Sequence, residues 1–401
     1  MRETWNFHSA GQLLFGRNAA RQVGEIAVRL SARRCLIVTD PVLVKAALVD
    51  RVRGPLEEHD IQVEIFSGGE PEPSFKAGDA CIEMARQFRP DAILGLGGGS
   101  NMDLAKITAT VVTHGGKPRD YVGDDKIPGP ILPVICMPTT AGTGSEVSAA
   151  AVLTDNDNQV KVGVLSNYLR PRAALVDPLL TLSCPAKLTA DSGIDALTHA
   201  IEAYTAVDNE AFPLPPGERS VYQGRHPLGE CLAEKAIALI GAHLRTAVKQ
   251  GSDLPAREGM ALGATLAGLA FSNVGVALVH ALEYPVGGAM HCSHGAGNGL
   301  LLPYVMRFNM PVRRKEFATI ARLLGEDTTG LDEQGAAERA IVAVERLRND
   351  IGIPQRLRDL GVRESQLRPF AEKAFSIKRI LRVNPRSMVI DDLEQILKSA
   401  L

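Results

Sequence analysis

The sequence predicts an α/β N-terminal domain with a mostly parallel, Rossmann-like sheet, residues 1–184, and an all-α domain, residues 185–401. At 401 residues the chain is long enough for two domains that each bury a full core. In the first half, short β-branched apolar runs alternate with amphipathic stretches, a pattern typical of βαβ units. The predicted strands lie at residues 35–40, 63–66, 92–100, 131–140 and 149–155.

The second half has a different texture, and we place the domain boundary within residues 178–187. Beyond it, segments rich in Ala, Leu, Glu and Arg repeat at helical spacing, as at residues 231–250. One segment breaks this pattern, because residues 207–229 are dense in Pro and Gly. We expect it to form a long surface loop in an otherwise helical domain.

Composition argues against several classes of partner. The net charge is −2 and no segment forms a Lys/Arg stripe, so neither nucleic acid nor an anionic membrane is expected to bind. The six cysteines are scattered without a CxxC pair, which suits a reducing compartment. The first ten residues hold no apolar signal segment, and no run of about 18 apolar residues occurs elsewhere. We therefore expect a cytoplasmic protein with a small-molecule partner.

A glycine-rich turn, GLGGGSNMDLAK at residues 95–106, follows a predicted strand and opens a predicted helix. Its glycines lack the Cβ atoms that would block a phosphate, and the free N–H groups of the next helix attract an anion. We expect a dinucleotide pyrophosphate to bind at Gly97, Gly98, Gly99 and Ser100. The alternative is a plain turn in which Ser100 caps the helix and Asp103 completes a capping box.

Two further elements favour a dinucleotide. Asp40 ends a predicted strand, where a carboxylate can accept hydrogen bonds from the adenosine ribose and would repel a 2′-phosphate. This position favours NAD over NADP, and a cap before Pro41 is the alternative. The loop PTTAGTGSE, residues 138–146, also follows a strand and is rich in small residues that let a cofactor approach closely. Its hydroxyl candidates are Thr139, Thr140 and Thr143.

The helical half holds a candidate metal site. Asp195 and His199 are four residues apart, so on a helix they project from one face, and their neighbours are apolar. A surface ion pair is the alternative, but burial without a partner would be costly for the carboxylate. His280, His291 and His294 lie within fifteen residues of a chain that has nine histidines, spaced by a helix end, a proline and a Gly-Gly turn. One carboxylate with two or three imidazoles suits iron(II) or zinc.

Taken together and in order, these motifs resemble the iron-dependent (group III) alcohol dehydrogenase family, from Phe15 to Met388. The resemblance implies an architecture like that of dehydroquinate synthase, and we expect a homodimer. It also implies that the glycine turn holds the NAD pyrophosphate, that Asp40 meets the ribose, that the threonine loop borders the cofactor and that Lys161 is a cofactor-side lysine. The implied metal ligands are Asp195, His199, His280 and His294, with His291 as a neighbour of the site.

The chain departs from the family pattern at two positions. Asn101 stands where the family usually has Pro after GGGS. Tyr284 stands where many members carry a further histidine, so a histidine proton relay is lost there. Together with residues 220–227, the tyrosine is similar to the hydroxyacid-oxoacid transhydrogenase branch, whose substrates are 4-hydroxybutyrate and 2-oxoglutarate. In that case Arg219 or Arg225 would offer a substrate carboxylate a bidentate partner.

The predicted function is a metal-dependent, NAD-linked oxidoreductase that interconverts an alcohol or hydroxyacid and its aldehyde or ketone. The metal would lower the pKa of the alcohol, whose carbon delivers hydride to nicotinamide C4 in a cleft between the domains. Tyr284 and His291 are the candidate catalytic residues, Tyr284 as a proton carrier. Three alternatives stay open: the transhydrogenase, an NAD-using metal-dependent lyase of dehydroquinate synthase type, and a non-catalytic NAD-binding scaffold.

Overall fold

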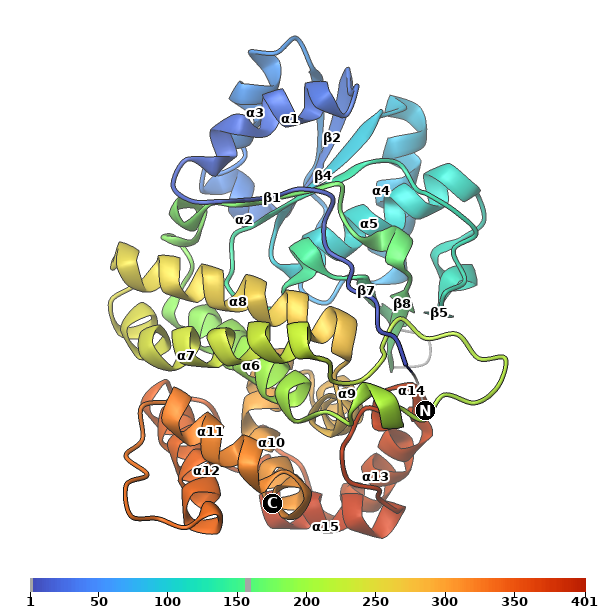
Figure 1. The fold of residues 1–401 in the computed structure, drawn as a ribbon. Coiled ribbons are helices and arrows are strands. Elements are labelled where there is room, and N and C mark those ends of the chain that lie inside the picture. The colour runs from blue at the N-terminus through green and yellow to red at the C-terminus, as the bar shows by residue number, and fades with distance from the viewer. Residues whose placement is uncertain (1–2, 156–159) are drawn as a thin grey trace. The chain divides into compact units, whose positions relative to one another are not determined.

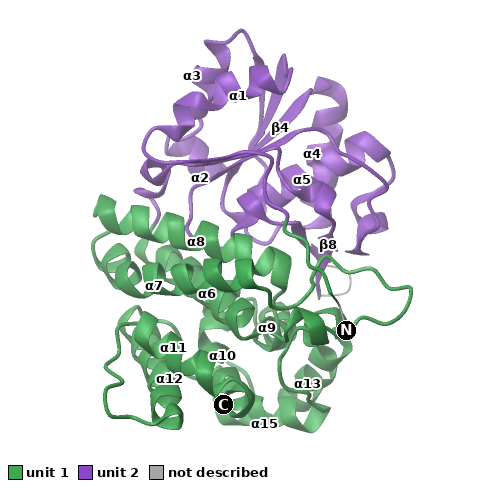
Figure 2. Cartoon of the chain, in the orientation of Figure 1, with its two compact units in different colours: residues 1–7, 185–401 green, residues 8–184 purple. Residues whose placement is uncertain are grey.

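The computed structural model describes residues 3–155 and 160–401. The chain forms two compact units, residues 8–184 and residues 1–7 together with 185–401 (Figure 2). The expected N-terminal domain began at residue 1, whereas the structure places the first segment with the helical unit. There the Trp5 ring stacks on His226 at 4.6 Å, and the backbone N–H of Asn6 donates to Gln223 at 2.9 Å. These contacts join residues more than 200 positions apart, which local sequence patterns do not report.

The α/β unit is built on a six-stranded sheet in the order β1-β9-β6-β4-β2-β3 (Figure 1). Every neighbouring pair in this sheet is parallel, which confirms the predicted fold class. The strands are β1 Leu13–Phe15, β2 Arg34–Val38, β3 Gln62–Phe66, β4 Ala92–Gly97, β6 Val134–Pro138 and β9 Ala173–Val176.

Helices cover both faces of this sheet, and its central strands are accordingly apolar throughout. In β2, Leu36 and Val38 join one hydrophobic core while Cys35 and Ile37 join the other, as the alternation of side chains along a strand requires. The first core is shared with α4 and α5, and the second with α1 and α3. The helices of this unit are α1 Val23–Arg29, α2 Pro41–Lys45, α3 Asp50–Glu57, α4 Phe75–Phe88 and α5 Gly99–His114.

A second, three-stranded sheet has the order β5-β8-β7, with β5 Gly123–Asp124, β7 Ala150–Asp155 and β8 Val160–Leu165. We expected the run at residues 149–155 to belong to the parallel sheet, and that assignment was wrong. β7 pairs antiparallel with β8, which follows it after a few residues. A connection that short cannot provide the crossover that a parallel pair needs.

The second unit is helical, and its described residues contain no strand beyond an isolated bridge between Asp208 and Arg225. α6 is its central helix, and every residue from Gly193 to Thr205 on it is buried. The helices are α6 Ala186–Thr205, α7 Pro227–Lys249, α8 Leu254–Val274, α9 Leu278–Met290, α10 His294–Asn309, α11 Arg314–Leu323, α12 Glu333–Asp350, α13 Leu367–Ser376, α14 Lys378–Leu381 and α15 Ile390–Ala400.

Two local expectations in this unit need correction. The proline and the Gly-Gly pair of the histidine-rich segment were expected to lie outside a helix. Instead, α9 continues through Pro285 and ends at Met290. Its first ten residues, Leu278–Gly287, are all buried, so packing outweighs the lost hydrogen bond. The expected surface loop at residues 207–229 is only partly exposed, because Val221 and Tyr222 are buried and α7 begins at Pro227.

No single helix in the described residues is long and apolar enough to cross a membrane. The pair α8 and α9 reaches that length and composition only when the two are taken together, and the pair is bent by 103°.

The crossing of α10 over α6 depends on glycine. Gly295 and Gly299 lie one turn apart on α10, and Gly295 packs directly on the backbone carbonyl of Asp191. A Cβ atom on Gly299 would stand 2.7 Å from both Cγ atoms of Ile194, which is fully buried. The two helix backbones are therefore closer here than any larger residue on α10 would allow.

We predict that Gly299→Ala destabilises the protein by about 1–3 kcal/mol, because Ile194 has no room to move away from the added methyl group. Urea unfolding measures the change. Gly78→Ala on α4 is the control, since its Cβ would meet the nearest atom at an ordinary 3.6 Å. Equal stability of the two variants would contradict the close approach of α10 to α6.

Candidate metal centre and dinucleotide site

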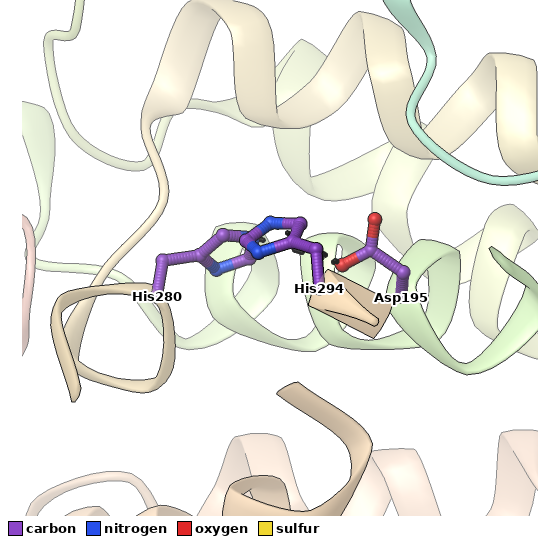
Figure 3. Close-up of side chains that lie close together, drawn as sticks. All are labelled: Asp195, His280 and His294. Carbon is purple, nitrogen blue, oxygen red and sulfur yellow. Dashed lines mark ion pairs between the residues drawn. The ribbon is translucent and has the colours of Figure 1, made fainter. Parts of the chain in front are cut away.

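Three ligand-type side chains converge inside the helical unit. Asp195 comes from the middle of α6, His280 from α9, and His294 is the first residue of α10 (Figure 3). One potential ligand atom from each lies within 4.8 Å of the others. The Nε2 atoms of His280 and His294 lie 3.9 Å and 4.0 Å from Oδ1 of Asp195. Ligands of a tetrahedral ion at about 2.1 Å stand about 3.4 Å apart, so the group has the size of a metal site.

His199 lies beside this group rather than within it. It follows Asp195 by one turn of α6, and its Nδ1 is 3.9 Å from Oδ2, the other oxygen of that carboxylate. Its ring stacks on His280 at 4.7 Å and on Phe271 at 4.2 Å. The structure therefore brings three of the four predicted ligands into one tight group and holds the fourth in contact with two of them.

Two buried glutamates, which the sequence analysis missed, hold the far nitrogens of the histidine rings. Nδ1 of His280 lies 2.6 Å from Glu202, whose carboxylate also accepts the backbone N–H groups of Ala277 and Val279 at the start of α9. Nδ1 of His294 lies 2.5 Å from Glu283. A signal for both was present, because each glutamate follows a predicted ligand histidine by three residues and so shares its helix face.

These hydrogen bonds decide which nitrogen of each ring is available. A carboxylate accepts, so Nδ1 carries the proton and Nε2 keeps its lone pair. Among the described residues, Nε2 of His280 is buried and has no hydrogen-bond partner. A buried, unpaired nitrogen lone pair facing a carboxylate and a second imidazole is the arrangement that a divalent transition ion fits.

The electrostatics of the group also suit a cation. Burial raises the pKa of Asp195, but the nearby His199, His294 and His280 and a hydrogen bond from Asn298 outweigh it and bring that pKa to about 2. The amide of Asn298 donates to Oδ1 of Asp195 at 2.7 Å. With Glu202 and Glu283, three carboxylates with at most 4% of their side chains exposed surround the imidazoles. The group is therefore rich in buried negative charge, which a bound cation would balance.

The two candidate catalytic residues lie in different surroundings. Tyr284 is buried on α9, one turn after His280, and its ring centre is 6.0 Å from that of His294. His291 ends α9 as an exposed residue with a φ of 51°, three positions before His294. Tyr284 is therefore a neighbour of the metal group, whereas no contact places His291 against it among the described residues.

In the α/β unit, the glycine turn joins β4 to α5. Gly97 ends β4 with a φ of 144°, a conformation that favours glycine. A Cβ on Gly99 would stand 2.7 Å from Cγ2 of Thr143, so the turn and the threonine loop touch. Gly98 is the N-cap residue of α5, and no side-chain hydrogen bond caps this helix. Its first N–H groups are thus available to an anion.

The capping-box alternative for Ser100 and Asp103 was wrong. Ser100 lies inside α5, and its Oγ accepts the backbone N–H of Glu72 at 3.2 Å. Asp103 accepts hydrogen bonds from Ser145 Oγ at 2.6 Å and from the backbone N–H of Val152 at 2.9 Å. Both side chains bind neighbouring segments, so neither of them caps the start of α5.

A buried lysine holds the threonine loop in place. Lys106 on α5 is fully buried, and its Nζ donates to Ser145 Oγ at 2.9 Å and to the carbonyls of Ser148 and Ala150 at 3.1 Å and 2.9 Å. Burial lowers the pKa of this lysine, and Asp103 partly offsets that. In the same loop the backbone N–H of Thr139 donates to Gly97 at 2.9 Å. Sequence patterns had marked the loop but not the lysine that supports it.

The remaining predicted cofactor residues each have a protein partner. Asp40 is the N-cap of α2, and its Oδ1 accepts the N–H groups of Val42 and Leu43 at 2.9 Å and 3.0 Å. The cap interpretation is therefore correct, and Oδ2 remains on the side of the glycine turn, where Asn101 donates to it at 2.8 Å. Lys161 on β8 forms an ion pair with Glu72 at 2.8 Å.

The parallel α/β unit and the carboxylate–histidine group of the helical unit are features of metal-dependent dehydrogenases. Comparison with known proteins specifies the family. Residues 10–178 match the model for iron-containing alcohol dehydrogenase, and residues 218–401 match the C-terminal model of the same family. The chain belongs to the iron-containing alcohol dehydrogenase family. This confirms the family, and it confirms an alcohol oxidoreductase rather than a non-catalytic scaffold.

Individual relatives agree along the whole chain. The NAD-dependent methanol dehydrogenase of Bacillus methanolicus is 38% identical over 396 residues, covering 99% of this chain and 100% of the relative. The 1,3-propanediol dehydrogenase of Klebsiella pneumoniae is 40% identical and covers 96% of each chain. A crystal structure of a 1,3-propanediol oxidoreductase superposes with a TM-score of 0.93 at 38% identity and covers 100% of both chains.

We predict that Glu283→Leu weakens metal binding by about 10- to 100-fold, because the His294 ring loses the partner that fixes its tautomer. Glu283→Gln, whose amide oxygen can still accept a hydrogen bond from Nδ1 of His294, should lose less metal affinity. Metal affinity is measured by competition with a chelator of known affinity. Glu234→Gln is the control, since that carboxylate binds Tyr204 in the same unit. Unchanged affinity in Glu283→Leu would rule out this role for the glutamate.

Proposed function

We propose that the protein is an NAD-dependent dehydrogenase of primary alcohols that holds one divalent ion. The observation that carries the proposal is the buried Nε2 of His280, which has no hydrogen-bond partner in the described structure although Nδ1 is held by Glu202. Asp195, His280 and His294 are the central ligands, and His199 is the fourth. Iron(II) is the proposed ion because the family is iron-containing, and zinc, which accepts the same donors, is the alternative.

In this proposal the chain's own residues prepare the site for chemistry. The ion supplies Lewis acidity toward an alcohol hydroxyl, and NAD supplies the hydride acceptor. Asp195 contributes a full negative charge because its pKa lies at about 2. Glu202 and Glu283 keep the Nδ1 protons in place, so that both Nε2 atoms face the ion. Asp195 and His280 are buried, which limits the water that reaches their side of the group.

The proton of the alcohol needs a carrier, and Tyr284 is the proposed one. Its phenol group belongs to a buried ring whose centre lies 6.0 Å from that of His294. His291, the exposed residue that follows α9, stays a proposed neighbour of the site.

For the cofactor, we propose that the open start of α5 receives the NAD pyrophosphate and that Asp40 receives the adenosine ribose. The missing cap on a 16-residue helix supports the first contact, and the free acceptor capacity of Asp40 Oδ2 supports the second. Further proposed contacts are Gly97, Gly98, Gly99, Ser100, Thr139, Thr140, Thr143 and Lys161.

The substrate class follows from the relatives. Those named for methanol, long-chain alcohols and 1,3-propanediol are 38%, 41% and 40% identical to this chain. The substrates in these names differ in length but are all alcohols, so overall similarity supports the functional group rather than one compound.

The transhydrogenase alternative loses its main support. Arg225 was a candidate partner for a substrate carboxylate, yet its guanidinium already pairs with Asp208 at 2.7 Å and with Glu316 at 2.8 Å. Arg219 lies in the exposed part of the loop. No observation therefore favours an oxoacid as the second substrate.

We predict that the metal-loaded protein, given NAD and a panel of primary alcohols, releases reduced nicotinamide without any oxoacid. The absorbance of the reduced cofactor measures this directly. A transhydrogenase would instead keep the reduced cofactor bound and turn over only after 2-oxoglutarate is added.

We also predict that His280→Ala loses metal and turnover together, with metal affinity falling by more than about 100-fold, because a ligand and not only its support is removed. Metal content after dialysis, measured by elemental analysis, is the first readout. His59→Ala, an exposed histidine of the α/β unit, serves as the control. Full metal content in His280→Ala would disprove the ligand assignment.

A further inference from the structure

Asn101 is an unusual residue at a sensitive place. It is the third residue of α5, directly after the glycine turn, and only 2% of it is exposed. The family resemblance implies proline at this position. Proline is tolerated in the first turn of a helix, so helix geometry alone does not require asparagine.

The side-chain amide of Asn101 uses both of its hydrogens. Nδ2 donates to Oδ2 of Asp40 at 2.8 Å and to the carbonyl of Leu96 at 3.0 Å. Both partners are acceptors, so the amide must present its NH₂ group to them, because an oxygen there would face two other oxygens. The orientation of the amide is thus determined by its surroundings.

Two glycines hold this amide tightly. A Cβ atom on Gly97 would overlap Nδ2 of Asn101, and a Cβ atom on Gly69 would overlap its Oδ1. Gly97 ends β4, and Gly69 lies three residues after the end of β3. The N–H of Gly69 donates to the carbonyl of Thr39, next to Asp40. The amide therefore connects the end of β4 with the end of β2 and has little freedom to rotate.

The consequence falls on Asp40. An ionised carboxylate offers about four acceptor positions. Oδ1 uses two for the N–H groups of Val42 and Leu43, and Oδ2 uses one for Asn101. One position remains, on Oδ2, for a further donor. With both oxygens held, the carboxylate cannot turn away from an approaching group.

We propose that Asn101 is a specificity-determining positioning residue that fixes Asp40, so that the carboxylate accepts one ribose hydroxyl of NAD and repels the 2′-phosphate of NADP. The inference rests on the proposed function, in which Asp40 meets the ribose. Without Asn101 only Oδ1 would be held, by the N–H groups of Val42 and Leu43, so Oδ2 could move away from the ribose hydroxyl and from a 2′-phosphate. The asparagine therefore sharpens the discrimination without touching the cofactor's phosphates.

The test measures the dissociation constants of NAD and NADP for the metal-loaded protein by isothermal titration calorimetry. Asn101→Leu keeps the side-chain volume and removes the amide. We expect NAD binding to weaken about 10-fold, because the carboxylate of Asp40 would lose most of its charge-assisted hydrogen bond to the ribose. NADP binding should stay equal or improve. Asn101→Pro, the residue usual in the family, is the second variant, should the leucine disturb folding. Thr110→Val, buried on the same helix, is the control and should change neither constant.

Asp40→Ala completes a double-mutant cycle. In that background, Asn101→Leu should have no further effect on the ratio of the two constants. A ratio unchanged by the Asn101 variants while Asp40→Ala abolishes discrimination would overturn the role of Asn101 and leave the ribose contact intact. Discrimination that survives Asp40→Ala would overturn the ribose contact itself, and with it this inference. Equal weakening of both nucleotides by Asn101→Leu would indicate a merely structural role.

Discussion

The carboxylate of Asp195, buried in the middle of α6, is the constraint on which the helical unit depends. A buried charge is costly unless it is hydrogen-bonded or paired. Asn298 from α10 and the imidazoles of α6, α9 and α10 provide that compensation. Three helices must therefore meet around this carboxylate, and Gly295 and Gly299 let α10 approach α6 closely.

A second layer of charge makes the arrangement specific. Glu202 and Glu283 each hold the outer nitrogen of one histidine, so the inner nitrogens point toward Asp195 without protons. Glu202 does this while also binding the first N–H groups of α9, and thus places the helix and orients its ligand with one side chain. Three buried carboxylates and the Nε2 of His280, which has no hydrogen-bond partner among the described residues, therefore lie in one small group that suits a divalent ion.

In the α/β unit the important polar groups are the ones left without a protein cap, namely the first N–H groups of α5. Lys106 donates hydrogen bonds to the threonine loop, and Ser100 and Asp103 bind neighbouring segments. None of these side chains therefore caps the start of α5. The carboxylate of Asp40 fits both predicted roles, because one of its oxygens caps α2 and the other lies beside the glycine turn. A carboxylate has enough acceptor positions to do both.

The sequence by itself determined the features that depend on near neighbours: the change from strand to helix periodicity, the glycine turn after β4, and the placement of Asp195 and His199 one turn apart. Tertiary structure alone decided the rest, including the glutamate partners of His280 and His294, the support from Lys106 and the contact between Asn101 and Asp40. The physical reason is one of range. Helix and strand periods relate residues a few positions apart, whereas these contacts mostly join residues tens of positions apart and exist only once helices and strands have packed at particular distances.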